Sequence, residues 1–235
     1  NIHLTKVDSE YPDNKLTGAT FEVYKDSNGS GKLDDGDELL GTLTEKEIGS
    51  YEMKDLFYGR YFVKETKAPE GFVLDTGVYE VMIDTDGKTC EVENKAGVGF
   101  INEAMRGNLK IVKTSSDGKI KGFAFRITGA NGYDIILETN DKGEIVIEGI
   151  RIGDYTVSEV SNSASAMYVL PADKKATVKT GSTTIVEMHN VLRDTPKTGD
   201  ATNLPLLYAL AGLSAVGIAV TAFVGFKKKK KEGND

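Results

Sequence analysis

The chain repeats itself, and this internal similarity limits the folds open to it more than any other feature. The matching segments are residues 2–8 (IHLTKVD) with 109–115 (LKIVKTS), and 59–65 (GRYFVKE) with 153–159 (GDYTVSE). Each copy also closes on an asparagine at the end of an apolar segment, Asn102 or Asn190. A repeat of about 85 to 105 residues predicts two domains with one fold.

Within each copy the apolar residues alternate with polar ones in short segments rich in Val, Ile, Thr, Tyr and Phe. Turn-forming residues such as Asn, Asp and Gly separate these segments, and no sustained helical periodicity precedes residue 204. The pattern therefore predicts an all-β protein made of two tandem Ig-like β-sandwich domains, residues 1–104 and 105–192. Residues 104–108 are expected to form a short joint between them.

The composition excludes several classes of partner and crosslink. The formal net charge is −7, which argues against nucleic acid as a partner and favours an acidic extracellular surface. The single cysteine, Cys90, cannot form an internal disulfide. The chain starts at Asn1 without a signal peptide, so we expect it to be a fragment of a longer exported protein.

Three polar residue types are predicted to face the core in both copies. Residues two apart in a strand share a face, so Lys6 points the same way as Ile2 and Leu4. The same parity places Glu65, Asn102 and their second-copy counterparts, Lys113, Glu159 and Asn190, among core residues. Because an unpaired buried charge is costly, these groups must satisfy one another or react.

Residues 61–72 (YFVKETKAPEGF), with the strand-borne lysine and the terminal asparagine, resemble the E-box and reacting residues of CnaB-type (SpaA-like, prealbumin-like) domains of Gram-positive adhesins and pilins. The resemblance covers residues 1–192 and implies an intramolecular isopeptide bond in each domain, autocatalysed by the glutamate. The implied triads are Lys6, Glu65 and Asn102, and Lys113, Glu159 and Asn190. A buried ion pair without a covalent bond is the alternative interpretation, and Asn94 is a weaker alternative acceptor.

An acidic loop matches the twelve-position calcium-binding pattern. Its expected ligands are Asp26, Asn28, Ser30, Lys32 through its carbonyl, Asp34 and Asp37. Position 12 is Asp rather than Glu, no flanking helices are predicted, and acidic turns of this composition are also common as solvated loops. Calcium is the one cofactor that the sequence suggests, and the isopeptide chemistry requires none.

The C-terminal region has three elements in a fixed order. Thr195, Pro196, Lys197, Thr198 and Gly199 lie in a linker, residues 193–203. An apolar segment follows at residues 204–226, long enough at about 1.5 Å per residue to cross a hydrocarbon core of about 30 Å. The basic tail, residues 227–235, predicts a cytoplasmic C-terminus and an extracellular N-terminal side.

The segment from Thr195 to Gly199 resembles the LPXTG sorting motif of sortase substrates, with Thr195 where the family usually has leucine. The resemblance implies that a sortase cleaves between Thr198 and Gly199 and passes Thr198 to a peptidoglycan cross-bridge amine. The transmembrane helix would then hold only the precursor at the membrane. The expected location is extracellular, covalently attached to a Gram-positive cell wall.

The sequence thus predicts a non-enzymatic, wall-anchored stalk of an adhesin or pilin, stabilised by isopeptide bonds. A host or neighbour-cell ligand would bind through a region upstream of Asn1. Two alternatives stay open: the domains could be the spacer of a wall-anchored enzyme with its catalytic domain upstream, or a ligand-binding surface module.

Overall fold

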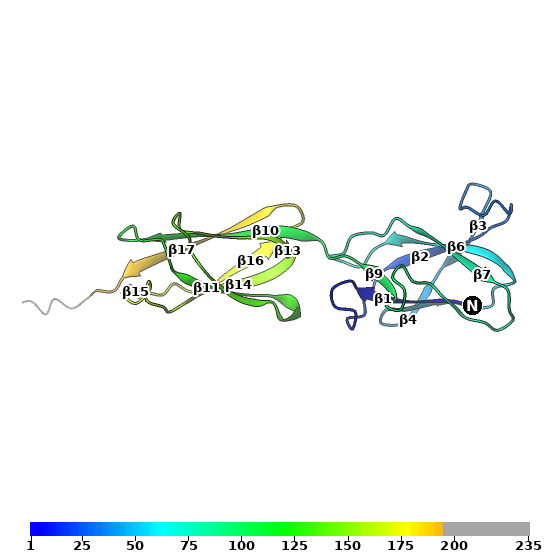
Figure 1. Ribbon diagram of the computed structural model, residues 1–235, viewed down its shortest axis with the longest axis horizontal. Coiled ribbons are helices and arrows are strands. Elements are labelled where there is room, and N and C mark those ends of the chain that lie inside the picture. The colour runs from blue at the N-terminus through cyan, green and yellow to red at the C-terminus, as the bar shows by residue number, and fades with distance from the viewer. Residues whose placement is uncertain (195–235) are drawn as a thin grey trace, which may run out of the picture. The chain divides into compact units, whose positions relative to one another are not determined.

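The computed structural model describes residues 1–194, and these form two β-sandwich domains within one compact unit, Asn1–Leu192 (Figure 1). The strands of the first domain are β1 (Ile2–Asp8), β2 (Thr20–Lys25), β3 (Glu38–Thr42), β4 (Thr44–Glu47), β5 (Ser50–Met53), β6 (Gly59–Lys67), β7 (Val78–Ile83), β8 (Cys90–Glu91) and β9 (Phe100–Asn102). Those of the second are β10 (Arg106–Ser115), β11 (Ala124–Thr128), β12 (Asp134–Glu138), β13 (Glu144–Arg151), β14 (Gly153–Val160), β15 (Tyr168–Val169), β16 (Lys174–Val178) and β17 (Thr183–Leu192). A single 3₁₀ turn, η1 (Ala130–Gly132), is the one helical element among the described residues, so the all-β prediction is confirmed.

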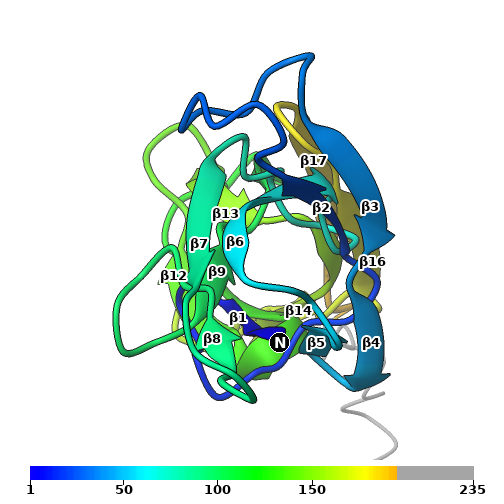
Figure 2. The same ribbon diagram turned by 90° about the vertical axis from the view of Figure 1, so that its right-hand side faces the viewer.

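Each domain consists of two sheets, and the central strands of these sheets correspond between the domains. In the first domain β4-β5-β1-β8, with β9 also paired to β1, forms one sheet, and β3-β2-β6-β7 forms the other. Figure 2, with the N-terminus toward the viewer, shows β1, β5 and β8 across from β2, β6 and β7. The second domain has the corresponding sheets β13-β10-β17-β15 and β12-β11-β14-β16.

The first and last strands of each domain are parallel neighbours. β1 pairs with β9 so that Lys6 lies opposite Phe100 and Asp8 lies opposite Asn102. β10 pairs with β17 in the same register, with Lys113 opposite Met188. Each lysine therefore lies one same-face step from its asparagine, across two strands that are far apart in sequence.

Alternating residues from the facing sheets fill the two cores. In the first domain the fully buried side chains include Ile2, Leu4, Phe21, Val63 and Phe100. Phe21 and Phe100 contact edge to face, with ring centroids 4.9 Å apart, the arrangement that aromatic quadrupoles favour. The second core uses the equivalent positions, among them Leu109, Ile111, Phe125 and Val157.

The joint expected at residues 104–108 is largely strand. β10 begins at Arg106, and Ala104 is buried in an isolated bridge to Phe72. The Met105 amide donates a 2.8 Å hydrogen bond to the Gly71 carbonyl. Backbone pairing of this kind leaves no signal in side-chain polarity, which explains why the sequence suggested a loop.

Candidate functional site: two buried lysine, glutamate and asparagine triads

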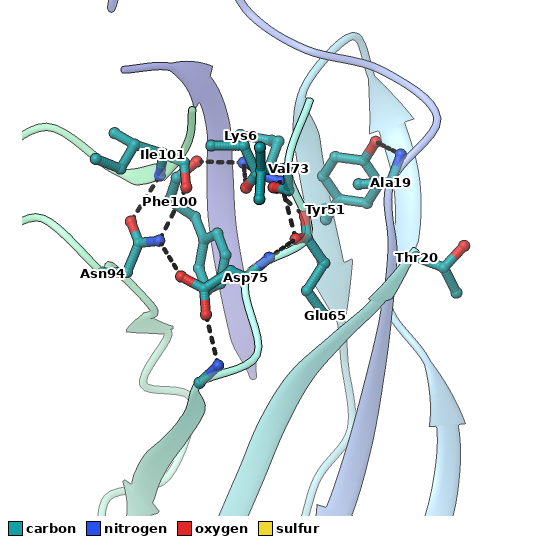
Figure 3. Close-up of polar contacts among 12 residues, drawn as sticks. Lys6, Ala19, Thr20, Tyr51, Glu65, Val73, Asp75, Asn94, Phe100 and Ile101 are labelled. Carbon is teal, nitrogen blue, oxygen red and sulfur yellow. Dashed lines mark hydrogen bonds and ion pairs between the residues drawn. The ribbon is translucent and has the colours of Figure 1, made fainter. Parts of the chain in front are cut away.

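Lys6 has its amine in the core of the first domain. Its side chain is completely buried, and Nζ donates a 3.0 Å hydrogen bond to the Phe100 carbonyl (Figure 3). Nζ also donates to Oδ1 of Asn102, which is itself only 3% exposed. The predicted nucleophile therefore touches the side-chain amide of the predicted acceptor.

Glu65 comes from the opposite sheet and lies against both partners. Glu65 lies near the C-terminal end of β6, opposite Phe21 of β2, and its side chain is completely buried. Its Oε2 accepts hydrogen bonds from Asn102 Nδ2 at 2.9 Å and from the Asp75 amide at 2.8 Å. Its Oε1 has no hydrogen-bond partner and lies 4.0 Å from Lys6 Nζ. One carboxyl group thus faces the amine with one oxygen and the amide with the other.

Burial changes the protonation of this pair in the direction that the chemistry needs. Desolvation lowers the pKa of Lys6 to about 8, against the opposing charges of Glu65, Asp75 and Asp8. Desolvation also raises the pKa of Glu65 above its ordinary value, although its hydrogen bonds and Lys6 oppose the shift. The neutral amine and the neutral acid, which are rare together in water, become accessible side by side.

The second domain buries the same three residue types, but the hydrogen bond of its lysine goes to a backbone carbonyl rather than to the asparagine. Lys113, Glu159 and Asn190 are all buried, and Asn190 Nδ2 donates a 2.7 Å hydrogen bond to Glu159 Oε1. Lys113 Nζ lies 4.2 Å from the centre of the Phe123 ring and donates to the Thr114 carbonyl. Burial lowers the pKa of Lys113 and raises that of Glu159.

Two atoms of the second triad have no hydrogen-bond partner. They are Asn190 Oδ1 and Glu159 Oε2, both inaccessible to solvent. Buried acceptors without donors are costly, whereas the equivalent Asn102 oxygen of the first domain accepts a hydrogen bond from Lys6 Nζ.

Asn94, the alternative acceptor, is engaged elsewhere. Its Oδ1 accepts from the Ile101 amide at 2.6 Å, and its Nδ2 donates to the Ile101 carbonyl and to Asp75 Oδ2 (Figure 3). The hydrogen bonds of Lys6 Nζ go to Phe100 and Asn102 instead. The geometry thus brings Asn102, rather than Asn94, to the amine.

Sequence reasoning missed two contributors to the first site, Val73 and Asp75. The Val73 carbonyl accepts a 2.8 Å hydrogen bond from Asn102 Nδ2, and the Asp75 amide binds Glu65. Both contributions come from the backbone of a loop between β6 and β7. Side-chain identity carries little information about such contacts, although the position of the loop just after residues 61–72 is a usable signal.

The acidic loop from Asp26 to Asp37 folds on itself. Asn28 Nδ2 donates to Asp34 Oδ1 at 2.8 Å, the Gly31 amide to Asp26 Oδ2, and Ser30 Oγ to the Lys32 carbonyl. The Arg60 guanidinium lies 3.4 Å from Asp26 Oδ2 and supplies positive charge there. Within residues 1–194, no group of three or more His, Cys, Asp or Glu side chains is arranged to hold a metal ion, and calcium binding stays a prediction.

The sorting motif from Thr195 to Gly199, the apolar segment 204–226 and the basic tail 227–235 lie outside the described residues. Among residues 1–194 no helix has the length and apolar character needed to cross a membrane.

Comparison with known proteins identifies the family that the fold and the triads indicate. A family model described as "SpaA: Prealbumin-like fold domain" matches residues 1–96 and 107–192. The chain belongs to this family, and its domains are of the CnaB/SpaA type found in Gram-positive pilins and surface proteins. The prediction of two such domains is therefore confirmed.

The chain is similar to a streptococcal surface protein, to a Bacillus anthracis protein and to a streptococcal minor pilin. The chain is 26% identical over 194 residues to the trypsin-resistant surface T6 protein of Streptococcus pyogenes serotype M6, covering 69% of this chain and 34% of the relative. The TIE protein of Bacillus anthracis has a similar structure, with a TM-score of 0.58, 23% identity, and coverage of 82% of this chain and 33% of that one. A minor pilin of Streptococcus agalactiae matches with a TM-score of 0.39 and 18% identity, over 85% of this chain and 98% of that one. The chain thus spans about a third of the length of the T6 and TIE proteins.

Proposed function

We propose that this chain is the stalk region of a wall-anchored adhesin or pilin, and that each of its domains is locked by an autocatalytic lysine–asparagine isopeptide bond. The observation that carries the proposal is the contact of Lys6 Nζ with Asn102 Oδ1, with the Glu65 carboxyl group next to both. All three groups are buried, and the lysine and asparagine lie on the first and last strands of the domain.

The proposed reaction balances without an outside reagent. Lys6 Nζ forms a bond to Cγ of Asn102, and the bond from Cγ to Nδ2 breaks. Glu65 accepts a proton from the attacking amine and supplies one to Nδ2, which leaves as ammonia. The carboxyl group ends as it began. The orientation of Oε1 toward Lys6 and of Oε2 toward Nδ2 supports this shuttle.

Such a bond would change how the domain carries force. β1 and β9 are parallel neighbours, so tension between the ends of the domain loads their few hydrogen bonds in shear. A covalent link from Lys6 to Asn102 would carry that load before the sheet has to separate. A stalk that holds a cell to a surface under flow would benefit from this resistance to mechanical unfolding.

Anchoring would follow from the C-terminal signal. Sortase would cleave between Thr198 and Gly199 and join Thr198 to a peptidoglycan amine, which leaves the domains outside the cell. The family match and the surface-protein relative support a cell-surface location.

The anchoring proposal is tested by fusing the full chain to an export signal peptide, expressing it with Thr198→Ala in a sortase-positive host and measuring the share of the protein in the cell-wall fraction. The substitution should abolish wall attachment, because it replaces the residue whose carbonyl would be attacked. Asp200→Asn, just beyond the motif, is the matched control and should leave wall attachment unchanged. Wall attachment of the Thr198→Ala chain would contradict the proposal.

The isopeptide bonds are tested by intact mass. The full chain should be lighter than its sequence mass by one ammonia for each bond, and tandem mass spectrometry should recover a peptide pair joined through Lys6 and Asn102. An unmodified mass would show that the triads are only buried ion pairs.

A ligand-binding module remains a second proposal because of two aromatic side chains. Phe57 and Tyr58, in the loop before β6, are 82% and 63% exposed. Exposed aromatic pairs are frequent in binding surfaces. The test is the double variant Phe57→Ser/Tyr58→Ser. Loss of adherence to host cells in a variant whose intact mass still shows the isopeptide bonds would support this function.

A further inference from the structure

We propose that Asp75 is a positioning residue for bond formation in the first domain, holding Glu65 and Asn102 in place through a hydrogen-bonded clamp. The inference rests on the proposed isopeptide chemistry and extends it to a residue outside the triad. Asp75 lies in the loop between β6 and β7. It is outside β1, β6 and β9, the three strands that carry the triad.

The loop makes two direct contacts with the reacting groups. The Asp75 amide donates to Glu65 Oε2 at 2.8 Å, and the Val73 carbonyl accepts from Asn102 Nδ2 at 2.8 Å. Together they leave Glu65 Oε1 as the carboxyl oxygen with no hydrogen-bond donor, on the side of the amine. The position of this loop therefore decides how the glutamate and the amide are oriented.

The Asp75 carboxylate fixes the loop. Its Oδ1 accepts from the Gly77 amide at 2.7 Å, and its Oδ2 accepts from the Tyr79 hydroxyl at 2.9 Å and from Asn94 Nδ2 at 2.8 Å. Asn94 in turn binds both the amide and the carbonyl of Ile101, the residue that precedes Asn102. The clamp from Asp75 through Asn94 to Ile101 thus ties the loop that orients Glu65 to the strand that carries the acceptor (Figure 3).

The carboxylate is ionised and acts on both reacting groups. Burial acts to raise the pKa of Asp75, but the hydrogen bonds from Asn94, Gly77 and Tyr79 and the nearby Lys6 outweigh it, and the pKa is lowered. The negative charge of Asp75 acts to raise the pKa of Lys6, and the charges of Glu65 and Asp8 act in the same direction. The charge of Asp75 also acts to raise the pKa of Glu65. Removing the charge should therefore move both pKa values downward.

The clamp also borders a way out for the leaving group. A cavity of about 330 Å³ is lined by Asp75, Tyr79, Asn94 and Asn102, among others. Because Asn102 is among the lining residues, we expect this cavity to receive the released ammonia. Within residues 1–194, the second triad shows no hydrogen bond to Glu159 or Asn190 from a corresponding loop, so it provides an internal comparison.

The test measures the rate of bond formation in newly synthesised full chain. Translation in a cell-free system is stopped, samples are quenched in acid over time, and peptide mass spectrometry follows each domain separately. Asp75→Ala and Asn94→Ala should each slow the first-domain reaction about tenfold, equivalent to about 1.4 kcal/mol. The double variant should be no slower than either single one, because both break the same clamp. The second-domain rate should not change, and the exposed Asp86→Asn is the matched control.

Asp75→Asn separates positioning from general stability. It retains an acceptor oxygen but removes the charge, so the pH profile of the first-domain rate should move to lower pH. A variant that only weakens the fold would lower the rate without moving the profile. The inference would be overturned if the Asp75→Ala and Asp75→Asn chains formed the first bond as fast as the natural chain at every pH. It would also be overturned if they formed it more slowly but with the same dependence of rate on pH. If the natural chain itself forms no first-domain bond, the proposed function fails, and this inference fails with it.

Discussion

Lys6 Nζ lies 4.0 Å from Glu65 Oε1, and neither side chain is accessible to solvent. A buried pair of this kind usually adds little net stability, because the cost of desolvating two charges offsets their attraction. The same burial makes the neutral forms of both groups accessible, which is the condition for an amine to act as a nucleophile. The burial of this pair is therefore consistent with the proposed reaction, and stabilisation alone gives little reason for it.

Glu65→Gln should abolish the first bond and leave the second intact. Glutamine preserves the size of the side chain and can still accept from the Asp75 amide, but it cannot accept and return a proton. Intact mass should show the loss of one ammonia rather than two, with the crosslinked peptide from the second domain retained. Glu159→Gln should give the converse result, and the exposed Glu47→Gln should change neither bond. Formation of the first bond in Glu65→Gln would rule out the glutamate as proton shuttle.

The rate of first-domain bond formation should have a maximum between the raised pKa of Glu65 and about pH 8, the pKa of Lys6. Below the raised pKa of Glu65 both groups hold protons, so the amine cannot attack. Above the pKa of Lys6, about 8, the amine is free but the glutamate has lost its proton. Quenched time courses across this range check the profile. A rate that keeps rising toward about pH 10, the ordinary range of a lysine pKa, would indicate simple amine attack without the acid.

The unbonded Glu65→Gln chain should be less stable than the natural chain. The link would close a loop whose ends lie 96 positions apart, and by analogy with disulfides such closure contributes about 4–5 kcal/mol. Denaturant unfolding of the first domain measures the difference, with Lys6→Met as an independent unbonded variant. Equal midpoints for bonded and unbonded chains would show that the link does not restrict the unfolded state.

Phe100→Ala should destabilise the first domain by about 3–5 kcal/mol, because it removes a fully buried ring from the core. The ring contacts Phe21 and Tyr79 edge to face, and the Lys6 ammonium lies 5.2 Å from its centre. The measurement belongs in the Glu65→Gln background, where no crosslink masks unfolding. Val78→Ala, in the same domain at a position 45% exposed, should cost less than about 0.5 kcal/mol. If Phe100→Ala had a similarly small effect, the neighbouring core residues would have to close the space left by the missing ring.

The sequence predicted which polar residues face the core, because strand parity is a local property. Lys6 shares its face with Ile2 and Leu4, and the structure buries all three. Calcium binding at the acidic loop stays a prediction, and the spacing of its oxygen ligands does not reveal that Arg60 lies beside Asp26. The sequence contained no indication of the clamp through Asp75 and Asn94, because a loop, a turn and a strand meet there from three parts of the chain.

The repeat, the alternating strands and the core-facing lysine, glutamate and asparagine were determined by sequence alone, since each depends on the order of neighbouring residues. Tertiary structure decided which asparagine meets the amine, which oxygen of Glu65 faces Lys6, and how the two triads differ. Those relationships depend on the pairing of β1 with β9 and of β10 with β17, between strands at opposite ends of each domain. Long-range register and loop path set such distances, and neither is encoded in a local pattern.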